Sequence, residues 1–162
     1  PGMADAHTAH HAILAAEAAA FHGAWLRERP DDYGSDVRRG LELGQLVPAV
    51  DYVNARRVQA IVRATFRAAL AEADVLVTPC LPRPPLQVGE AMSREPAVAW
   101  NRLLTPVNLA GYPALSVPCG FDGAGMPVGL QIIGRPFEEA MLLRVARAYE
   151  RATEWGTRRP PI

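Results

Sequence analysis

Apolar residues recur near helical spacing at the start of the chain. Residues 4–29 are rich in alanine, and their larger apolar side chains are Ile13, Leu14, Phe21, Trp25 and Leu26. This spacing is typical of a helix with one apolar side. Pro30, followed by Asp31 and Asp32, ends the pattern. We therefore expect a first helix over residues 4–29.

Two further helices are expected in the next stretch of sequence. Ser35 and Asp36 are suitable N-caps for a short helix that runs through Leu43 and closes at Gly44. A longer helix is expected to begin near Pro48, because proline is tolerated in the first helical turn. Its apolar positions fall on one face and are Val58, Val62, Phe66, Ala69 and Ala73.

The clearest helical pattern lies near the end of the chain. Residues 138–153 have acids at the start and arginines later, as the helix dipole favours. One apolar stripe runs along them and consists of Met141, Leu142, Val145, Ala148, Tyr149 and Ala152. A further helix over residues 91–104, which contains Trp100, is expected to break before Pro106.

Three short apolar segments predict strands. They are residues 74–79 (DVLVTP), 114–118 (ALSVP) and 128–133 (VGLQII). The last two are separated by CGFDGAGMP, whose Asp122, Gly123 and Gly125 are turn residues, so we expect a hairpin. A nucleotide-binding glycine loop is not expected there, because a strand follows where a helix would be required. The proline-rich PCLPRPPLQVG after the first strand predicts an irregular loop.

Strands that are apolar on both faces need cover above and below, and neighbours at their edges. Three such strands form a sheet that is too small for four or five helices to pack on. The pattern therefore indicates an α/β layer structure that these 162 residues do not complete. Further sequence or another subunit is expected to supply the rest.

Composition excludes several classes of function. The 17 basic and 17 acidic residues cancel, so no overall field attracts nucleic acid or an anionic membrane. Every basic residue is an arginine, and without lysine this chain has no lysine general base or Schiff base. Cys80 and Cys119 form neither a CxxC pair nor a metal quartet, so we expect inert thiols in a cytoplasmic protein. No apolar run is long enough to span a membrane.

Histidines and serines offer few candidates for chemistry. His7, His10 and His11 lie at helical spacings, so two of them could hold a metal ion. No second segment supplies a further ligand, and we expect surface histidines with no metal and no cofactor. The serines are Ser35, Ser93 and Ser116. None lies in a GxSxG motif, and the Ser116 hydroxyl is expected to bond the backbone within its strand.

Several motifs together carry a family resemblance. TPVNLAGYPALSVPCGF and GMPVGLQIIGRPFEEAMLLRVARAYE resemble the C-terminal portion of amidase-signature enzymes. RPDDYGSDVRRGLELG, DYVNARR and DVLVTPCLP stand upstream in the order and spacing of that family. The resemblance covers residues 4–162. It implies that residues 1–162 are the C-terminal portion of a single amidase domain, without its N-terminal catalytic half.

The resemblance implies a fold and a reaction. The fold is a large α/β/α sandwich around a mixed central sheet, incomplete in this chain. The reaction is hydrolysis of a carboxylic amide, or transfer of its ammonia, by a serine nucleophile, a cis-peptide serine and a lysine. These three residues lie in the N-terminal half of the family and have no counterpart here. We therefore expect that this chain contains no catalytic residue and hydrolyses no amide alone. The missing N-terminal half, or a partner subunit, is expected to complete the enzyme. A homodimer of the complete enzyme is a further alternative.

The resemblance also implies that this chain forms part of a substrate pocket. Trp100, Asn101, Thr105 and Asn108 are expected to face the acyl group of a small-molecule amide. For Thr105 and Asn108 the alternative is equally open, since both residue types suit a turn before Gly111.

Arg39 stands where glutamine-using members of the family carry an arginine for the substrate carboxylate, and Arg38 is an ordinary surface neighbour. Asn101 occupies the position of an acid that glutamine-using transamidation subunits carry for the substrate ammonium. This replacement favours small aliphatic or aryl amides. Two alternatives stay open: one component of a split amidase or amidotransferase, and a non-catalytic interaction module.

Overall fold

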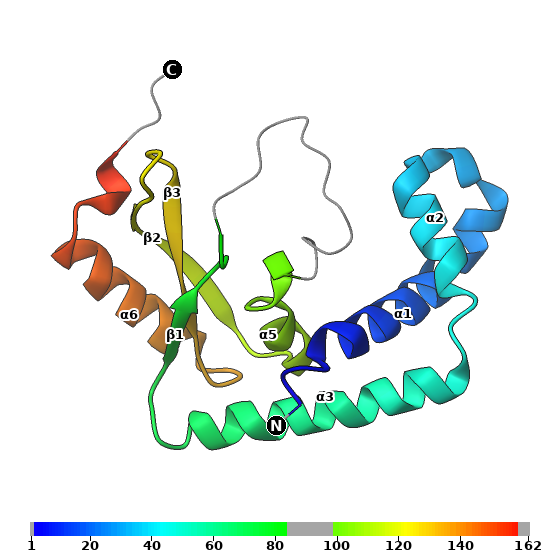
Figure 1. The fold of residues 1–162 in the computed structure, drawn as a ribbon, viewed down its shortest axis with the longest axis horizontal. Helices are drawn as coiled ribbons and strands as arrows, with labels where there is room; N and C mark the ends of the chain where they lie inside the picture. The colour runs from blue at the N-terminus through cyan, green and yellow to red at the C-terminus, as the bar shows by residue number, and fades with distance from the viewer. Residues whose placement is uncertain (1, 84–98, 159–162) are drawn as a thin grey trace. The chain divides into compact units, whose positions relative to one another are not determined.

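The computed structural model describes residues 2–83 and 99–158 of the chain (Figure 1). The chain divides into two compact units, Pro1–Val62 and Arg63–Ile162. In chain order the elements are α1 (Ala6–Glu28), η1 (Pro30–Asp32), α2 (Ser35–Gly44), α3 (Ala49–Ala69), β1 (Leu76–Pro79), α5 (Thr105–Ala110), β2 (Ala114–Phe121), β3 (Pro127–Ile133), α6 (Glu139–Ala152) and η2 (Trp155–Thr157). The boundary between the units falls within α3. Among the described residues, no helix is both long and apolar enough to cross a bilayer.

In the first unit, α2 packs against α1 through a buried glycine. Gly44 is the last residue of α2, and a Cβ added there would overlap the backbone carbonyl of Ala15 and lie 3.0 Å from Cβ of Ala19. The sequence pattern predicts Gly44 as a helix stop. Its backbone is not in the left-handed region, so this position requires glycine for close packing of two helices rather than for a special dihedral angle.

The helices predicted over residues 4–29 and from Pro48 are confirmed, but α3 ends at Ala69, so Ala73 of its predicted apolar face lies beyond the helix. Helix α1 buries a row of small and aliphatic side chains, namely Ala6, Ala9, Ile13, Ala19 and Leu26. On α3, Val62 is buried and Val58 half-buried, as expected. The expectation of a side-chain cap at Ser35 or Asp36 is wrong, because the N-cap is Gly34 and makes no side-chain bond. Both residues lie inside the first turn, where Asp36 still suits the helix dipole.

A three-stranded antiparallel sheet in the order β1-β3-β2 forms the centre of the second unit. Its register places Val77 and Leu115 on either side of Ile132. The hairpin predicted between β2 and β3 is confirmed. Its turn is held by Asp122, whose Oδ1 accepts hydrogen bonds from the backbone N–H groups of Ala124 and Met126, each at 2.9 Å.

Helix α6 covers one face of this sheet. The buried cluster joins Val117 and Ile132 of the strands to Leu142 and Ala146 of the helix. Gly134 follows β3, and a Cβ there would lie 2.9 Å from Leu142 Cδ2, so the glycine lets the helix approach the strand end. The bounds of α6 agree with the predicted stripe over residues 138–153.

The segment before β2 differs from the sequence expectation. One of the two alternatives for Thr105 and Asn108 is a turn before Gly111, and the structure has the short helix α5 there. Pro106 is compatible with its first turn, and Gly111, at φ 70°, ends it in the left-handed region. Of the helix expected over 91–104, residues 99–101 are helical. Residues 91–98 lie outside the described residues, as do residues 84–89 of the proline-rich loop.

Candidate functional site

The face of the sheet opposite α6 carries polar side chains in a row. Thr78 of β1, Gln131 of β3 and Ser116 of β2 stand side by side in the register. Because side chains alternate along a strand, these three point away from the face that contains Ile132. We call this surface, made by Thr78, Cys80, Ser116 and Gln131, the polar face.

Gln131 is the buried centre of the polar face. Its side-chain amide Nε2 donates to Thr78 Oγ1 at 2.9 Å and to the carbonyl of Leu103 at 3.2 Å. Only 4% of Gln131 is exposed, so both bonds are shielded from water and are costly to break. The second bond fixes the turn over residues 102–104, directly before α5, onto the sheet.

Because Gly129 has no side chain, the side chains of Cys80, which follows β1, and Ser116 of β2 come into contact above it. Cys80 N–H donates to the carbonyl of Gly129 at 2.8 Å, which places Cys80 beside the middle strand. Its Sγ then donates across that strand to Ser116 Oγ at 3.0 Å. A Cβ at Gly129 would lie 2.8 Å from Ser116 Oγ and 3.0 Å from Cys80 Sγ. The contact therefore depends on glycine at this position.

This contact corrects one expectation and leaves another in place. In the part of the chain that the structure describes, the bond found at the Ser116 hydroxyl comes from a thiol, where a bond to the backbone is expected from the sequence. Both cysteines are free thiols. Burial, and to a lesser extent the proximity of Cys80, raise the pKa of Cys119. A raised pKa keeps this thiol protonated and weakly nucleophilic near neutral pH, in line with the inert thiol expected from the sequence.

Helix α5 holds two of the predicted site residues in different environments. Thr105 is 3% exposed at its first position, whereas Asn108 is exposed. The end of the helix is fastened from α3, because Arg63 Nε donates to the carbonyl of Ala110 at 2.9 Å. The left-handed Gly111 donates back to Asn108 and Val107.

Trp100 and Asn101 lie just before that helix. Trp100 is half-buried, and its indole N–H is buried without a hydrogen-bond partner. A buried donor of this kind is rare in folded proteins and calls for an acceptor that the described chain does not contain. Asn101 is exposed, and its carbonyl accepts from the N–H of Leu104 at 3.0 Å.

Arg39 lies in the first unit, exposed on α2. Its neighbour Arg38 is tied to Asp31, with Nη1 donating to Oδ1 at 3.2 Å. The structure thus brings Trp100, Asn101, Thr105 and Asn108 into one short segment of the second unit and leaves Arg39 on a separate unit.

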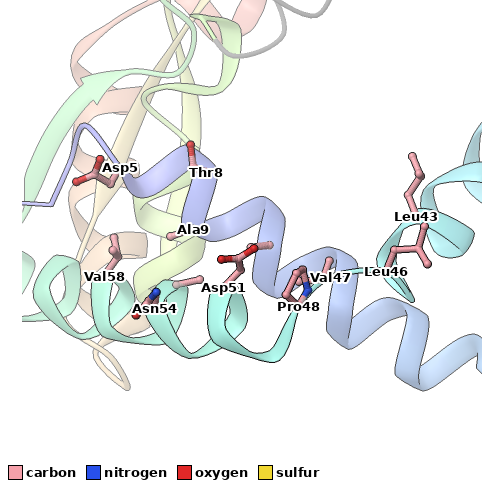
Figure 2. A pocket seen from close by; sticks show the side chains of 12 residues that line it. Asp5, Thr8, Ala9, Leu43, Leu46, Val47, Pro48, Asp51, Asn54 and Val58 are labelled. Atoms are coloured by element: carbon pink, nitrogen blue, oxygen red, sulfur yellow. The ribbon is translucent and has the colours of Figure 1, made fainter.

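The first unit has a cavity of its own. Its volume is about 580 Å³, and its wall comes from α1, from α3 and from the end of α2 with the loop that follows. Figure 2 shows Asp5 and Thr8 of α1, with Asp51 and Asn54 of α3, among its polar lining residues. None of the site residues predicted from the sequence lines it.

The side chains of the polar face can hydrogen-bond a polar ligand, but they do not form a nucleophilic centre. The Ser116 hydroxyl accepts a hydrogen bond from the Cys80 thiol, so its neighbour is a proton donor in this contact and not a general base. The sequence contains no lysine to take its proton. In the described part of the chain, no three histidine, cysteine, aspartate or glutamate side chains gather as metal ligands.

Sequence reasoning missed Gln131 and the pair of Cys80 with Ser116. A signal was available, since Ser116 and Gln131 are the polar residues within the apolar strand segments ALSVP and VGLQII. Alternation within a hairpin puts such residues on one face. The crossing of Cys80 over Gly129 needs the register of all three strands, which the sequence alone does not supply.

Comparison with known proteins identifies relatives for nearly all of this chain. A family model described as Amidase matches residues 3–143. The chain is 42% identical over 144 residues to a glutamyl-tRNA(Gln) amidotransferase subunit of Synechococcus elongatus, an alignment that covers 85% of this chain and 30% of that protein. It is 39% identical over 157 residues to an amidase of Pseudomonas putida, covering 93% and 34% respectively.

A solved amidase structure agrees with the fold. It superposes with a TM-score of 0.81 at 27% identity and covers 94% of this chain but 36% of that one. The α/β fold class expected from the sequence is therefore confirmed. The chain spans only about a third of the length of the proteins it matches.

Proposed function

The chain belongs to the amidase family, and from that membership we propose that it is the C-terminal portion of a domain that hydrolyses carboxylic amide C–N bonds. The observation that carries this proposal is the family match over residues 3–143 in a chain without lysine. The chain supplies sheet strands, covering helices and part of the substrate pocket. The serine nucleophile, the second serine and the lysine come from the missing portion, so this chain alone hydrolyses no amide.

The substrate-facing wall lies between Trp100 and Asn108. Trp100 supports this proposal best, because its buried indole N–H has no acceptor in the described chain and can donate to a substrate carbonyl or to the missing portion. Asn101 and Asn108 are exposed and can hydrogen-bond a neutral amide. Thr105 is buried and so acts by shaping the wall. Arg39 remains a candidate for binding a substrate carboxylate.

The preferred substrate is a small aliphatic or aryl amide. Asn101 is neutral, and a neutral side chain gives no ion pair to the ammonium of an amino-acid substrate. A second candidate is one component of a glutamine-using amidotransferase. One observation favours it, the 42% identity to the Synechococcus protein. A third, a non-catalytic interaction module, rests on the outer strands β1 and β2, which pair with no further strand in the described part of the chain.

The partner is the missing N-terminal half, on the same chain or on a separate one, in a cytoplasmic protein that acts without cofactor. A homodimer of the completed enzyme is compatible with this arrangement. The balanced charge of the chain supports neither nucleic acid nor an anionic membrane as a partner.

The proposal is tested by joining this chain to its upstream coding sequence and measuring ammonia release from aliphatic amides, aryl amides and glutamine. We expect hydrolysis that serine-directed inhibitors block, with aliphatic or aryl amides preferred. Trp100→Phe should raise KM or lower kcat, while Phe137→Ala, at a 95% exposed position outside the wall, should change neither. A folded full-length protein without amidase activity would contradict the proposal, and a preference for glutamine would favour the second candidate.

A further inference from the structure

Two histidines in the first turns of α1 direct their ring nitrogens at each other. His7 Nε2 and His11 Nε2 lie 3.1 Å apart, and the ring centroids are 4.3 Å apart. A spacing of four residues puts both side chains on the same side of the helix. His11 is exposed and His7 half-buried, so the pair is open to solvent.

The distance between these nitrogens equals that between two neighbouring ligands on one metal ion. Imidazole nitrogens bind first-row divalent metals at about 2.0–2.1 Å. Two nitrogens 3.1 Å apart at that range subtend roughly 100° at the ion. An angle this close to a right angle suits the tetragonal geometry of Cu²⁺ or Ni²⁺ better than the tetrahedral geometry of Zn²⁺.

We propose that His7 and His11 form a two-imidazole site for a divalent transition-metal ion, with Cu²⁺ bound most tightly. Each neutral ring coordinates through Nε2 and carries its proton on Nδ1, so the metal replaces the hydrogen bond between the two rings. Water fills the remaining positions. The order of affinity follows the general order for nitrogen ligands, in which Cu²⁺ exceeds Ni²⁺ and Zn²⁺. A third protein ligand, whose absence argued against a metal at the level of sequence, is not needed for this kind of site.

His10 lies beside the pair without belonging to it. Its ring meets that of His11 edge-on, with centroids 5.6 Å apart and planes at 81°. No set of three potential ligands forms in the described residues. His10 is therefore a matched control, because it is the same residue type, on the same helix, next to a proposed ligand.

The test is a titration of Cu²⁺ into the 162-residue chain with Cys80→Ser and Cys119→Ser, because the two free thiols would otherwise bind and reduce the ion. Binding is followed by calorimetry and by electron paramagnetic resonance. We expect one ion per chain with hyperfine coupling to two nitrogens. His7→Asn and His11→Asn should each weaken binding at least about tenfold, since each removes half of the chelate. His10→Asn should change the affinity by less than about twofold.

A second variant separates the site from nonspecific binding to histidine. The double substitution His11→Asn with Ala12→His keeps the same number of histidines but moves one ring to the neighbouring side of α1. Copper should raise the unfolding temperature of the parent chain and of His10→Asn, because the ion binds two successive turns of the folded helix α1, and should not raise that of the double variant. Equal copper affinity of the parent chain and the double variant, or a signal without two nitrogens, would overturn the proposal.

Discussion

At the residue scale, two glycines of one helix have opposite surroundings. Gly40 and Gly44 both lie in α2. A Cβ at Gly40 would meet nothing within 4 Å, whereas one at Gly44 would overlap the carbonyl of Ala15 on α1. A backbone atom cannot rotate away as a side chain can, so the two helices must separate to accept a methyl group at Gly44.

We expect Gly44→Ala to lower the free energy of unfolding by about 1–3 kcal/mol. Gly40→Ala should raise it by up to about 1 kcal/mol, because alanine favours the helix and loses less backbone entropy. Urea unfolding of the two variants measures the difference. Similar effects of both substitutions would contradict the packing of α2 on α1.

The raised pKa of Cys119 predicts how its reactivity depends on pH. The folded chain holds the thiol proton more tightly than the unfolded chain, so this group contributes stability below its ordinary pKa and loses it as the pH rises through the folded pKa. Alkylation of Cys119 by iodoacetamide should therefore reach half-maximal rate at a higher pH than that of an unstructured cysteine. Cys80→Ser should shift the midpoint only partway back, because burial is the larger cause.

At the scale of elements, the sequence predicted what repeats along the chain and not what depends on contact between distant segments. The periodic apolar stripe predicted α6, and the turn residues around Asp122 predicted the hairpin, because both are local patterns. The short helix α5 was missed, since six residues carry too little periodicity. The polar face was also missed, because Gln131 acts through Leu103 and Thr78, which lie 28 and 53 residues away in sequence.

Gln131 should be the polar residue on which this arrangement of elements depends most. Gln131→Ala removes two buried hydrogen bonds and leaves the Leu103 carbonyl without that donor, so we expect a loss of about 2–3 kcal/mol. Ser116→Ala, on the same face but exposed, should cost about 1 kcal/mol or less. Chemical unfolding compares the two, and hydrogen exchange at residues 102–104 should rise in the Gln131 variant alone.

At the scale of the whole molecule, no strand among the described residues pairs with the outer edges of the sheet of the second unit. Strands β1 and β2 are outer strands in the order β1-β3-β2. Val77 on β1 is 56% exposed, and open apolar edges of this kind promote pairing between chains. The inference of an incomplete sheet agrees with these features, but its premise of strands apolar on both faces is wrong, because one face carries Thr78, Ser116 and Gln131.

Val77→Lys should therefore reduce self-association of the isolated chain, because a charged edge opposes strand pairing. Val50→Lys is the matched control, since Val50 is 64% exposed but lies on α3. Light scattering over a range of protein concentrations measures the effect. Association that both substitutions lower equally would assign it to general surface hydrophobicity instead of to the strand edge.

The buried indole N–H of Trp100 affects the affinity of this chain for the missing portion or the substrate that accepts a hydrogen bond from it. An unsatisfied buried donor raises the free energy of the uncomplexed chain by about 1–3 kcal/mol. A carbonyl that reaches this nitrogen recovers that amount on binding, which corresponds to roughly 5- to 150-fold in affinity. A tryptophan analogue with sulfur in place of the indole nitrogen would remove this gain while keeping the shape of the ring.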